Sequence, residues 1–507
     1  MSLNLAISNA ASGLASVNLQ LALVSQNIAN AGTPGYARET AANSSATSGG
    51  FGGGVRTGPA TRQVNAQLQA SLSLQNAEVA GQQVRAQAMA AIDATQGVTA
   101  AGNDLASQLG KLRDAFTTLS GAPDSQAQQR QVTLDAGTLA RGINATANAV
   151  QAGRQAAQDG VRADVTTLNA TLRTIGALSD QITAFAAQGL STADLENQRD
   201  GQQQTATQIA GLRFLPQPNG DVLAFTAQGR AVALRAASGP FAIADATVGA
   251  NGAYPGSLPA LTLSGVDVTS RIIDGRIGAN LDLRDTTLPA QQAGLDEFAK
   301  TLANRLSGQG LALFTDPAGA VPAGGGVPVQ AGYVGFANTI QVNPAVAAKP
   351  SLVRDGTHAV AGSVTGASAF TPNPAGGPAG FTTLITRVTD QAFGAETRPG
   401  VPQAAPAAAG LGAGGTLSLP YGATGSLSDL AASLVGAQSQ ASAAATGTLA
   451  TGTALQATLT TKLQSATGVS IDTELSTMIG LQNAYGANAK VITAAQAMWT
   501  SLLAMIP

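Results

Sequence analysis

Few side chains in this chain of 507 residues could perform catalysis. The chain has no cysteine, which excludes disulfides, thiolate metal ligands and a cysteine nucleophile. It has one histidine, His358, so any Ser-His-Asp arrangement would depend on that residue alone. His358 follows Asp355, Gly356 and Thr357, a sequence typical of a turn. We therefore interpret His358 as a solvated loop residue rather than a general base.

Two further segments have spacings that could support chemistry. Residues 410–415 satisfy Gly-x-Gly-x-x-Gly, but the dinucleotide motif needs a strand before it and a helix after it. Pro406 and alanines precede this segment and strand-like leucines follow it, so we expect no nucleotide site. Residues 194–200 place paired carboxylates beside Arg199, as acid–base catalysis can require. We interpret them as a solvated helix face or as local ion pairs.

The chain is unusually poor in charge. Asp, Glu, Lys and Arg make up 11% of it, where about 25% is usual. The net charge of −2 gives no general attraction to nucleic acid. The sequence also has no Walker loop, nucleophile elbow or His-Glu-x-x-His motif. We therefore predict a protein that is not an enzyme, with no cofactor, no metal site and no nucleic-acid partner.

The elements that dominate the sequence lie at its two ends. Before Arg38, the first charged residue, apolar side chains recur in alternating steps of four and three. This spacing predicts a helix of about 28 residues with a coiled-coil seam, ended by Gly32 and Pro34. Its most apolar stretch, residues 15–28, contains six polar residues, so we expect no membrane insertion. The seam consists of Leu3, Ile7, Ala10, Leu14, Val17, Leu21, Val24 and Ile28.

A second seam follows the same spacing at the C-terminal end, where Lys490 is the only charge from residue 475 onward. The polar faces of both helices carry almost no charge. They could form an ordinary antiparallel pair in a monomer core, or a pair that packs further against copies or relatives of itself. We prefer the second interpretation, because buried charges are costly unless paired. The second seam consists of Ile471, Leu475, Met478, Gln482, Tyr485, Ala489, Ile492, Gln496, Trp499, Leu503 and Ile506.

Both ends carry a family resemblance. Residues 12–14 and 25–38 resemble the N-terminal motif of bacterial flagellar rod, hook and hook-associated axial proteins. The Gly-Tyr-x-Arg ending is similar to that of the hook-associated protein 1 family, and residues 465–492 resemble the end of the same proteins. Residues 194–200 resemble a helical signature of this family, with Asn197 where an aspartate is usual. The N-terminal motif residues are Asn27, Asn30, Gly35, Tyr36 and Arg38.

The resemblance implies a structural subunit that joins the flagellar hook to the filament and polymerises through the two seams. It implies type III export to the extracellular flagellum without a cleaved signal peptide, which agrees with the absence of Lys or Arg before Arg38. The implied partners are copies of the chain in a ring or axial tube, the hook protein, the second junction protein and an export chaperone. Two alternatives remain: another axial subunit such as the hook protein, or a secreted adhesin or enzyme with flagellar-type ends.

The middle of the chain predicts a mainly α fold with inserted β structure, elongated and multi-domain. Leucine and valine stripes between 105 and 182 predict several helices with short breaks, and Pro218-Asn219-Gly220 predicts a β-hairpin. Residues 39–58, rich in Gly, Ser and Thr, predict a flexible connector. We expect a terminal assembly domain (1–38 and 465–507), a helical bundle (59–211, 282–308 and 426–464), a β-rich segment (212–281) and a loop-rich β segment (309–425).

Overall fold

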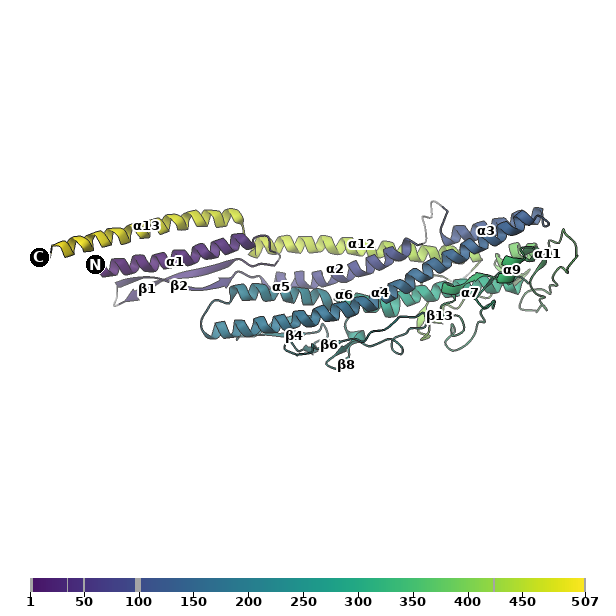
Figure 1. Cartoon of the computed structure of the whole chain (residues 1–507), viewed down its shortest axis with the longest axis horizontal. Coiled ribbons are helices and arrows are strands. Elements are labelled where there is room, and N and C mark those ends of the chain that lie inside the picture. Colours follow the sequence, from purple (N-terminus) through teal and green to yellow (C-terminus); the bar gives the residue numbers. More distant parts are fainter. Residues whose placement is uncertain (1–2, 34, 49–50, 96–101, 423–424, 506–507) are drawn as a thin grey trace. The chain divides into compact units, whose positions relative to one another are not determined.

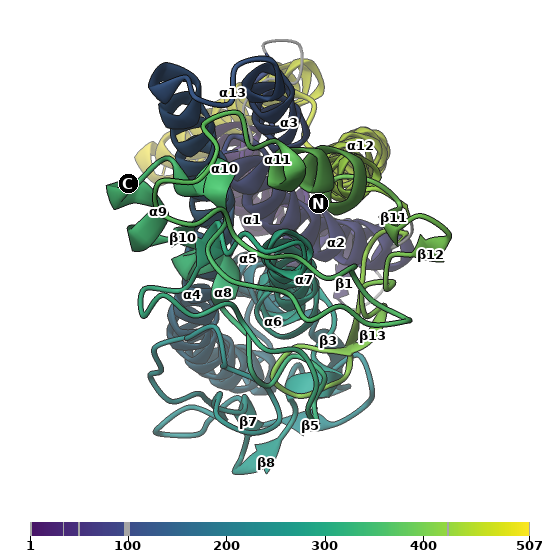
Figure 2. The ribbon, with the colours of Figure 1, turned by 90° about the vertical axis from the view of Figure 1, so that its right-hand side faces the viewer.

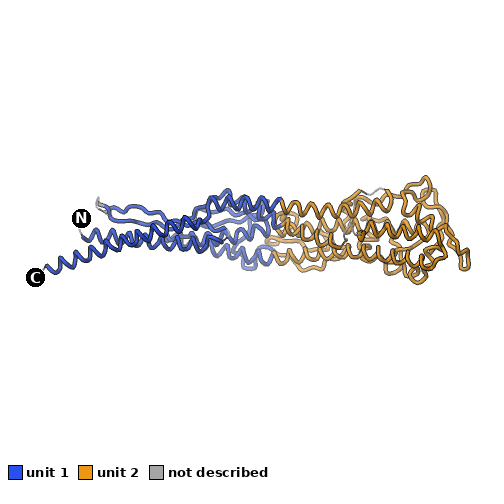
Figure 3. Tube along the Cα trace, turned by 90° about the horizontal axis from the view of Figure 1, so that it is seen from above, with its two compact units in different colours: residues 1–80, 165–241, 451–507 blue, residues 81–164, 242–450 orange. Residues whose placement is uncertain are grey.

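The computed structural model describes residues 3–33, 35–48, 51–95, 102–422 and 425–505 (Figure 1). Contacts divide the chain into two compact units (Figure 3). The first unit holds residues 1–80, 165–241 and 451–507, and the second holds residues 81–164 and 242–450. The fold is mainly α with inserted β structure, as the sequence predicts. The four-part domain division expected from the sequence stays a prediction.

Two long helices at the chain ends pack together in the first unit. They are α1 (Leu3–Asn30) and α13 (Ile471–Ala504), which lie side by side in Figure 1. The 28 residues of α1 match the predicted length. The Ser470 side chain caps α13, and its first turn carries two acidic residues, which the positive end of a helix dipole favours. Pro34 and Ile506 lie outside the described residues.

The prediction of a flexible connector at residues 39–58 is wrong. These residues form an antiparallel hairpin of β1 (Glu39–Ser48) and β2 (Phe51–Arg62), with Ser45 opposite Val55. The reason is packing against α1, which the local sequence does not reveal. The Val55 N–H donates to Ser12 Oγ at 3.1 Å, and Asn9 Nδ2 donates to the Gly52 carbonyl at 3.2 Å. Residues 49–50 of the connector lie outside the described residues.

Gly54 makes this packing possible. It has φ +100°, and a Cβ at this position would lie 2.1 Å from Ser12 Oγ. A residue with a side chain could neither adopt this backbone conformation without strain nor approach α1 so closely. The glycines that suggest flexibility in the sequence are therefore what lets the hairpin lie against the helix.

Beyond residue 125 the structure has one helix of 62 residues, α4 (Gln126–Ala187). The sequence predicts separate helices for the apolar stripes in this range, so the breaks expected between them are wrong. Its glycines are points of close approach: a Cβ on Gly176 would lie 2.9 Å from the Leu234 carbonyl oxygen. Helix propensity alone counts each glycine as a cost, whereas close packing offsets it. The other long helices are α2 (Ala66–Asp93), α3 (Leu105–Gly121), α5 (Ala193–Ala210), α7 (Leu288–Gly308) and α12 (Leu427–Thr467).

The predicted β-hairpin is present in the first unit. Strands β3 (Arg213–Pro216) and β4 (Val222–Phe225) pair antiparallel around the Pro218-Asn219-Gly220 turn, and β5 (Ala231–Val232) extends the sheet. A second three-stranded sheet has the order β6-β7-β8. Its strands are β6 (Phe241–Ala242), β7 (Thr262–Leu263) and β8 (Val266–Asp267).

The second unit contains one large buried apolar cluster, built from α3, α7, the first part of α4 and the loops after α7. Residues 309–424 contain the predicted short strands, but also short helices that the sequence analysis does not predict (Figure 2). The helices are α8 (Phe336–Thr339), α9 (Pro344–Ala348), α10 (Leu352–Asp355) and α11 (Thr383–Arg387), and another short helix, α6 (Gly275–Asp282), comes before α7 in the chain. The strands are β9 (Phe314–Thr315), β10 (Gln341–Val342), β11 (Glu396–Arg398), β12 (Val401–Pro402), β13 (Ala409–Leu411) and β14 (Leu417–Ser418).

Helix α1 has the length and composition to cross a membrane, and among the described residues no other helix does. Its most apolar window has a mean hydropathy of 1.2, with 33% of it buried in this structure. The six polar residues within 15–28 favour a helix that is not inserted in a membrane. Core helices and signal sequences can have the same length and composition.

Candidate functional site at the paired terminal helices

Helices α1 and α13 run antiparallel, which places the start of each helix beside the end of the other. Asn27 lies near Glu474 at one end, and Gly13 packs against Asn488 in the middle. At the other end, Asn4, Ile7, Gln496, Trp499 and Thr500 line an open groove. The pairing therefore extends along most of both helices.

The two expected seams differ in how far they are buried. The N-terminal seam residues, from Leu3 to Ile28, are all buried or half-buried. Of the C-terminal ones that the structure describes, Met478, Ala489 and Ile492 are half-buried. Gln482 and Gln496 are exposed. Five large side chains are exposed over 43–53% of their surface: Ile471, Leu475, Tyr485, Trp499 and Leu503.

The side of α13 that packs on α1 instead includes a seven-residue repeat of Glu474, Leu481, Asn488 and Ala495. Glu474 is fully buried and Ala495 is 1% exposed. The predicted seam takes the neighbouring Leu475, Gln482, Ala489 and Gln496 in place of these four residues, two of which are polar. A heptad count that accepts a buried carboxylate is the signal that could have found the repeat.

A second heptad-like stripe on α13 has no partner among the described residues. Val491, Met498, Leu502 and Met505 follow steps of seven, four and three, and each is between 47% and 81% exposed. We call these four residues the outer stripe. An exposed apolar row at coiled-coil spacing is typical of a surface that other helices cover.

The N-terminal motif residues surround the backbone just before β1. Asn27 Oδ1 accepts from the Glu39 N–H at 2.9 Å and from the Tyr36 hydroxyl at 3.0 Å. Asn27 Nδ2 donates to the Glu39 carbonyl at 2.9 Å. Asn27 is 1% exposed, so its amide satisfies buried groups that water cannot reach. Asn30 and Gly35 contribute turn geometry: Asn30 Oδ1 accepts from the Thr33 hydroxyl, and Gly35 has φ +80°.

An ion pair joins this motif to α13. Arg38 Nε lies 2.5 Å from Glu474 Oε1, and the Arg38 N–H donates to the Thr467 carbonyl at the end of α12. Asn27 Nδ2 lies 3.5 Å from the other oxygen of Glu474. The motif at the end of α1 therefore contacts the end of α12 and the first turn of α13.

A second asparagine clamps the same segment from α5. Asn197 accepts from the Ala37 N–H and donates to the Ala37 carbonyl, both at 3.2 Å, and donates to Glu39 Oε1 at 2.9 Å. Arg62 of β2 pairs with Glu196 at 2.8 Å and with Asp200 at 2.7 Å.

The interpretation of residues 194–200 as a solvated face or local ion pairs therefore needs correction. Glu196 and Asp200 pair with an arginine of a distant strand and anchor the hairpin on α5. Arg199 is 6% exposed and donates to the Gly220 carbonyl at 2.6 Å. The segment therefore positions other elements of the fold.

We call the polar group of Asn27, Tyr36, Arg38, Glu39, Asn197 and Glu474 the clamp. Burial determines the pKa values of its Glu39 and Tyr36 side chains. Burial raises the pKa of Glu39, and the nearby Asp194 carboxylate raises it further, while Asn197 and Arg62 lower it. Burial also raises the pKa of the Tyr36 hydroxyl, with Glu39 adding to the effect. Tyr36 therefore stays a neutral hydrogen-bond donor to Asn27.

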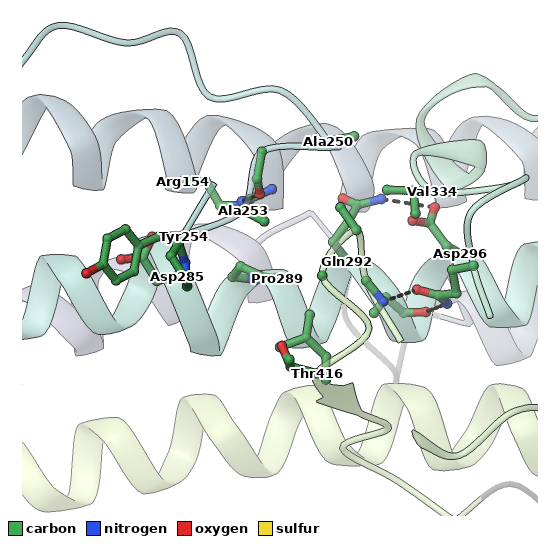
Figure 4. A pocket seen from close by; sticks show the side chains of 18 residues that line it. Arg154, Ala250, Ala253, Tyr254, Asp285, Pro289, Gln292, Asp296, Val334 and Thr416 are labelled. Carbon is green, nitrogen blue, oxygen red and sulfur yellow. Dashed lines mark hydrogen bonds between the residues drawn. The ribbon is translucent and has the colours of Figure 1, made fainter. Parts of the chain in front are cut away.

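The second unit contains a cavity of about 200 Å³, lined in part by Arg154, Tyr254, Asp285 and Gln292 (Figure 4). Residues 412–414 lie at this cavity, in the hairpin turn between β13 and β14, so no helix follows the Gly-x-Gly-x-x-Gly segment. Asp296 accepts from the N–H groups of two loop residues at 2.8 Å, and burial raises its pKa to about 7. The Asp296 carboxylate thus holds the loop around residues 335–337 against α7.

The described residues contain no group of three His, Cys, Asp or Glu side chains that could hold a metal ion. His358 is exposed, and its Nδ1 lies 2.9 Å from the Thr357 hydroxyl, as expected for a loop residue. The features that stand out in this chain are therefore the paired ends, their buried polar clamp and the outer stripe.

A chain that pairs its two ends and leaves an apolar stripe at coiled-coil spacing exposed has a surface of the kind that other helices cover. Residues 92–317 match the family model of the flagellar hook-associated protein FlgK helical domain. Residues 463–505 match that of the flagellar basal body rod FlgEFG protein C-terminal region. The chain belongs to the flagellar hook-associated protein 1 family, as its two ends indicate.

A solved structure, the flagellar hook junction protein FlgK from Burkholderia pseudomallei, is 21% identical with a TM-score of 0.40. The match covers 50% of this chain and 46% of that one, so this chain spans about half the length of that structure. No curated protein matches the sequence.

Proposed function

We propose that the protein is a structural subunit of the bacterial flagellum that joins the hook to the filament. The observation that carries this proposal is the outer stripe of α13, which lies within the matched rod-protein C-terminal region. The match to the FlgK helical domain favours the junction over other axial positions. The work of such a subunit is assembly, and we propose that it is not an enzyme.

The mechanism we propose is burial of the terminal helices against neighbouring subunits. Full burial of a large apolar side chain contributes about 1.5–3 kcal/mol, and the stripe residues are already partly covered, so each adds about 1 kcal/mol. Apart from Lys490, the surrounding polar residues are uncharged, which keeps the desolvation cost low. The exposed seam residues Ile471, Leu475, Tyr485, Trp499 and Leu503 would be covered in the same step.

The partners we propose are other copies of the chain in a ring or axial tube, the hook protein, the second junction protein and an export chaperone. The family supports these partners as a class. Type III export to the cell exterior, without a cleaved signal peptide, would bring the subunit to its place. The helical middle of the chain would then contact neighbouring subunits around the tube.

Immunogold electron microscopy of the tagged protein on intact flagella tests the location. We expect a single narrow band where the hook meets the filament. Label along the whole hook would instead make the chain a hook subunit, and the absence of label on flagella would reject the axial role.

Variants of α13 test the mechanism. Deletion of residues 475–507 should abolish incorporation into flagella while leaving the second unit folded. The double substitution Met498→Ser/Leu502→Ser should reduce incorporation at least tenfold, since about 2 kcal/mol of burial is lost. Thr493→Ser on the same helix is the matched control. Normal incorporation of the double variant would refute the role of the stripe.

A further inference from the structure

We infer that Glu474 is the positioning residue that holds α13 on α1 in one register, with Arg38 as its partner. Among the described residues of α1 and α13, no other charged side chain is buried. The inference deepens the proposed function, and its relevance to assembly rests on that function. A shift of α13 along α1 would move the outer stripe along the helix axis and away from the position at which neighbouring subunits would cover it.

The geometry of the carboxylate supports this role. Glu474 is fully buried, and both of its oxygens are engaged, by Arg38 Nε at 2.5 Å and by Asn27 Nδ2 at 3.5 Å. Its two partners are themselves fixed. Asn27 bonds both backbone groups of Glu39, and the Arg38 N–H bonds the Thr467 carbonyl at 3.0 Å. The carboxylate therefore meets a preformed site in the folded first unit.

The remaining contact between α1 and α13 selects register weakly. It consists largely of apolar and small side chains, such as Gly13 and Ala495, with amides such as Asn488. The repeat of Glu474, Leu481, Asn488 and Ala495 would fit almost as well after a shift of seven residues. A shift of one turn moves α13 by about 5.4 Å, which would remove Glu474 from Arg38.

The free-energy cost of such a shift comes mainly from the charged group. An unpaired buried carboxylate is strongly destabilising, whereas a displaced alanine or leucine finds a similar neighbour. Single buried polar groups fix register in coiled coils by the same principle. Glu474 thus supplies the specificity that an uncharged interface lacks.

The absence of cysteine from the chain permits a direct test by cross-linking. In the full chain, Gly13→Cys is combined with Asn488→Cys for the observed register. Pairs with Ala484→Cys and with Ala495→Cys report slips of one turn and one heptad. Each pair is oxidised and scored on non-reducing gels in three backgrounds: unchanged, Glu474→Gln and Arg38→Gln.

We expect the 13–488 pair to exceed the slipped pairs about tenfold in the unchanged background and about twofold in either variant. The double variant Arg38→Gln/Glu474→Gln should be no worse than the single ones, because the two residues act together. Asp472→Asn is the matched control. It removes the same charge from the same helical turn at an exposed position, and it should keep the tenfold preference.

Two results would overturn the inference: a preference for the 13–488 pair that survives Glu474→Gln, or no such preference in the unchanged background. Cross-linking of the isolated chain does not depend on flagella, so it is separate from the immunogold test. If label is missing from the junction while the variants lose register, the proposed function fails and the role of Glu474 stands.

Discussion

Asn197 satisfies the backbone of Ala37 in both directions and also donates to Glu39, which only an amide can do. The family resemblance leads one to expect an aspartate here. A carboxylate could not donate to the Ala37 carbonyl, and it would lie beside Glu39. Glu39 and Asn197 are therefore matched to each other in this chain.

Asn197→Asp should lower the free energy of unfolding of the first unit by about 1–3 kcal/mol, through a lost donor and a new like-charge contact. Adding Glu39→Gln should restore at least half of this loss, because a glutamine amide can donate to the new carboxylate. Chemical denaturation followed by tryptophan fluorescence measures both, since Trp499 lies in this unit. Gln202→Glu, one turn further along α5, is the control for added charge; an equal loss there would contradict the pairing.

The raised pKa of Glu39 makes stability depend on pH. The folded chain holds this proton more tightly than the unfolded chain does, so the contribution to stability is full in acid and disappears as pH rises through the folded pKa. Glu39→Gln removes the titration. We expect the variant and the parent to be equally stable near pH 4 and the variant to be more stable near pH 8. A difference independent of pH would show that the carboxyl does not titrate in this way.

Part of the clamp could be found from the sequence and part could not. Asn27, Tyr36 and Arg38 lie within one short motif, so the resemblance identifies them together. Asn197 lies 160 residues from Ala37 and Glu474 lies 436 residues from Arg38, and only the folded chain places them against the same backbone segment. No local periodicity encodes such a meeting of distant residues.

The packing of the β1–β2 hairpin on α1 depends on one position, Gly54. Gly54→Ala should detach it from α1, because the new Cβ would meet Ser12 Oγ and the backbone would be strained by about 1–3 kcal/mol. Hydrogen exchange of residues 39–62 should become faster. Gly58→Ala, whose Cβ would lie 3.6 Å from the nearest atom, is the control and should leave exchange unchanged. Equal exchange in both variants would show that Gly54 does not anchor the hairpin.

The two hairpins show what local sequence can predict. The turn between β3 and β4 has Pro-Asn-Gly between apolar runs, a local signal that predicts the structure it forms. The hairpin of β1 and β2 is rich in Gly, Ala, Ser and Thr and has no apolar alternation, and α1 supplies contacts that order it. Two apolar stripes that the sequence predicts as separate helices belong to the single helix α4, whose glycines have close neighbours in the fold.

Over the whole molecule, the large apolar cluster belongs to the second unit, whereas the clamp belongs to the first. Leu302→Ala creates a cavity in that cluster and should cost about 2–5 kcal/mol, measured by far-UV circular dichroism in denaturant. The register preference between positions 13 and 488 should not change. Leu134→Ala, at a position 63% exposed, is the control and should cost little. Loss of register in Leu302→Ala would show that the two units are energetically coupled.

The placement of Arg38 against Glu474 has a consequence for the media in which the protein can work. In residues 1–38 and 471–507, the acidic side chains are Asp472 and Glu474 and the basic ones are Arg38 and Lys490, so these segments carry no net side-chain charge. Dissolved salt weakens contacts between exposed charges, with a screening length that falls from about 10 Å at 0.1 M to about 3 Å at 1 M. The outer stripe is apolar and leaves such screening little to act on. Terminal contacts built in this way would tolerate the change from fresh water to brine.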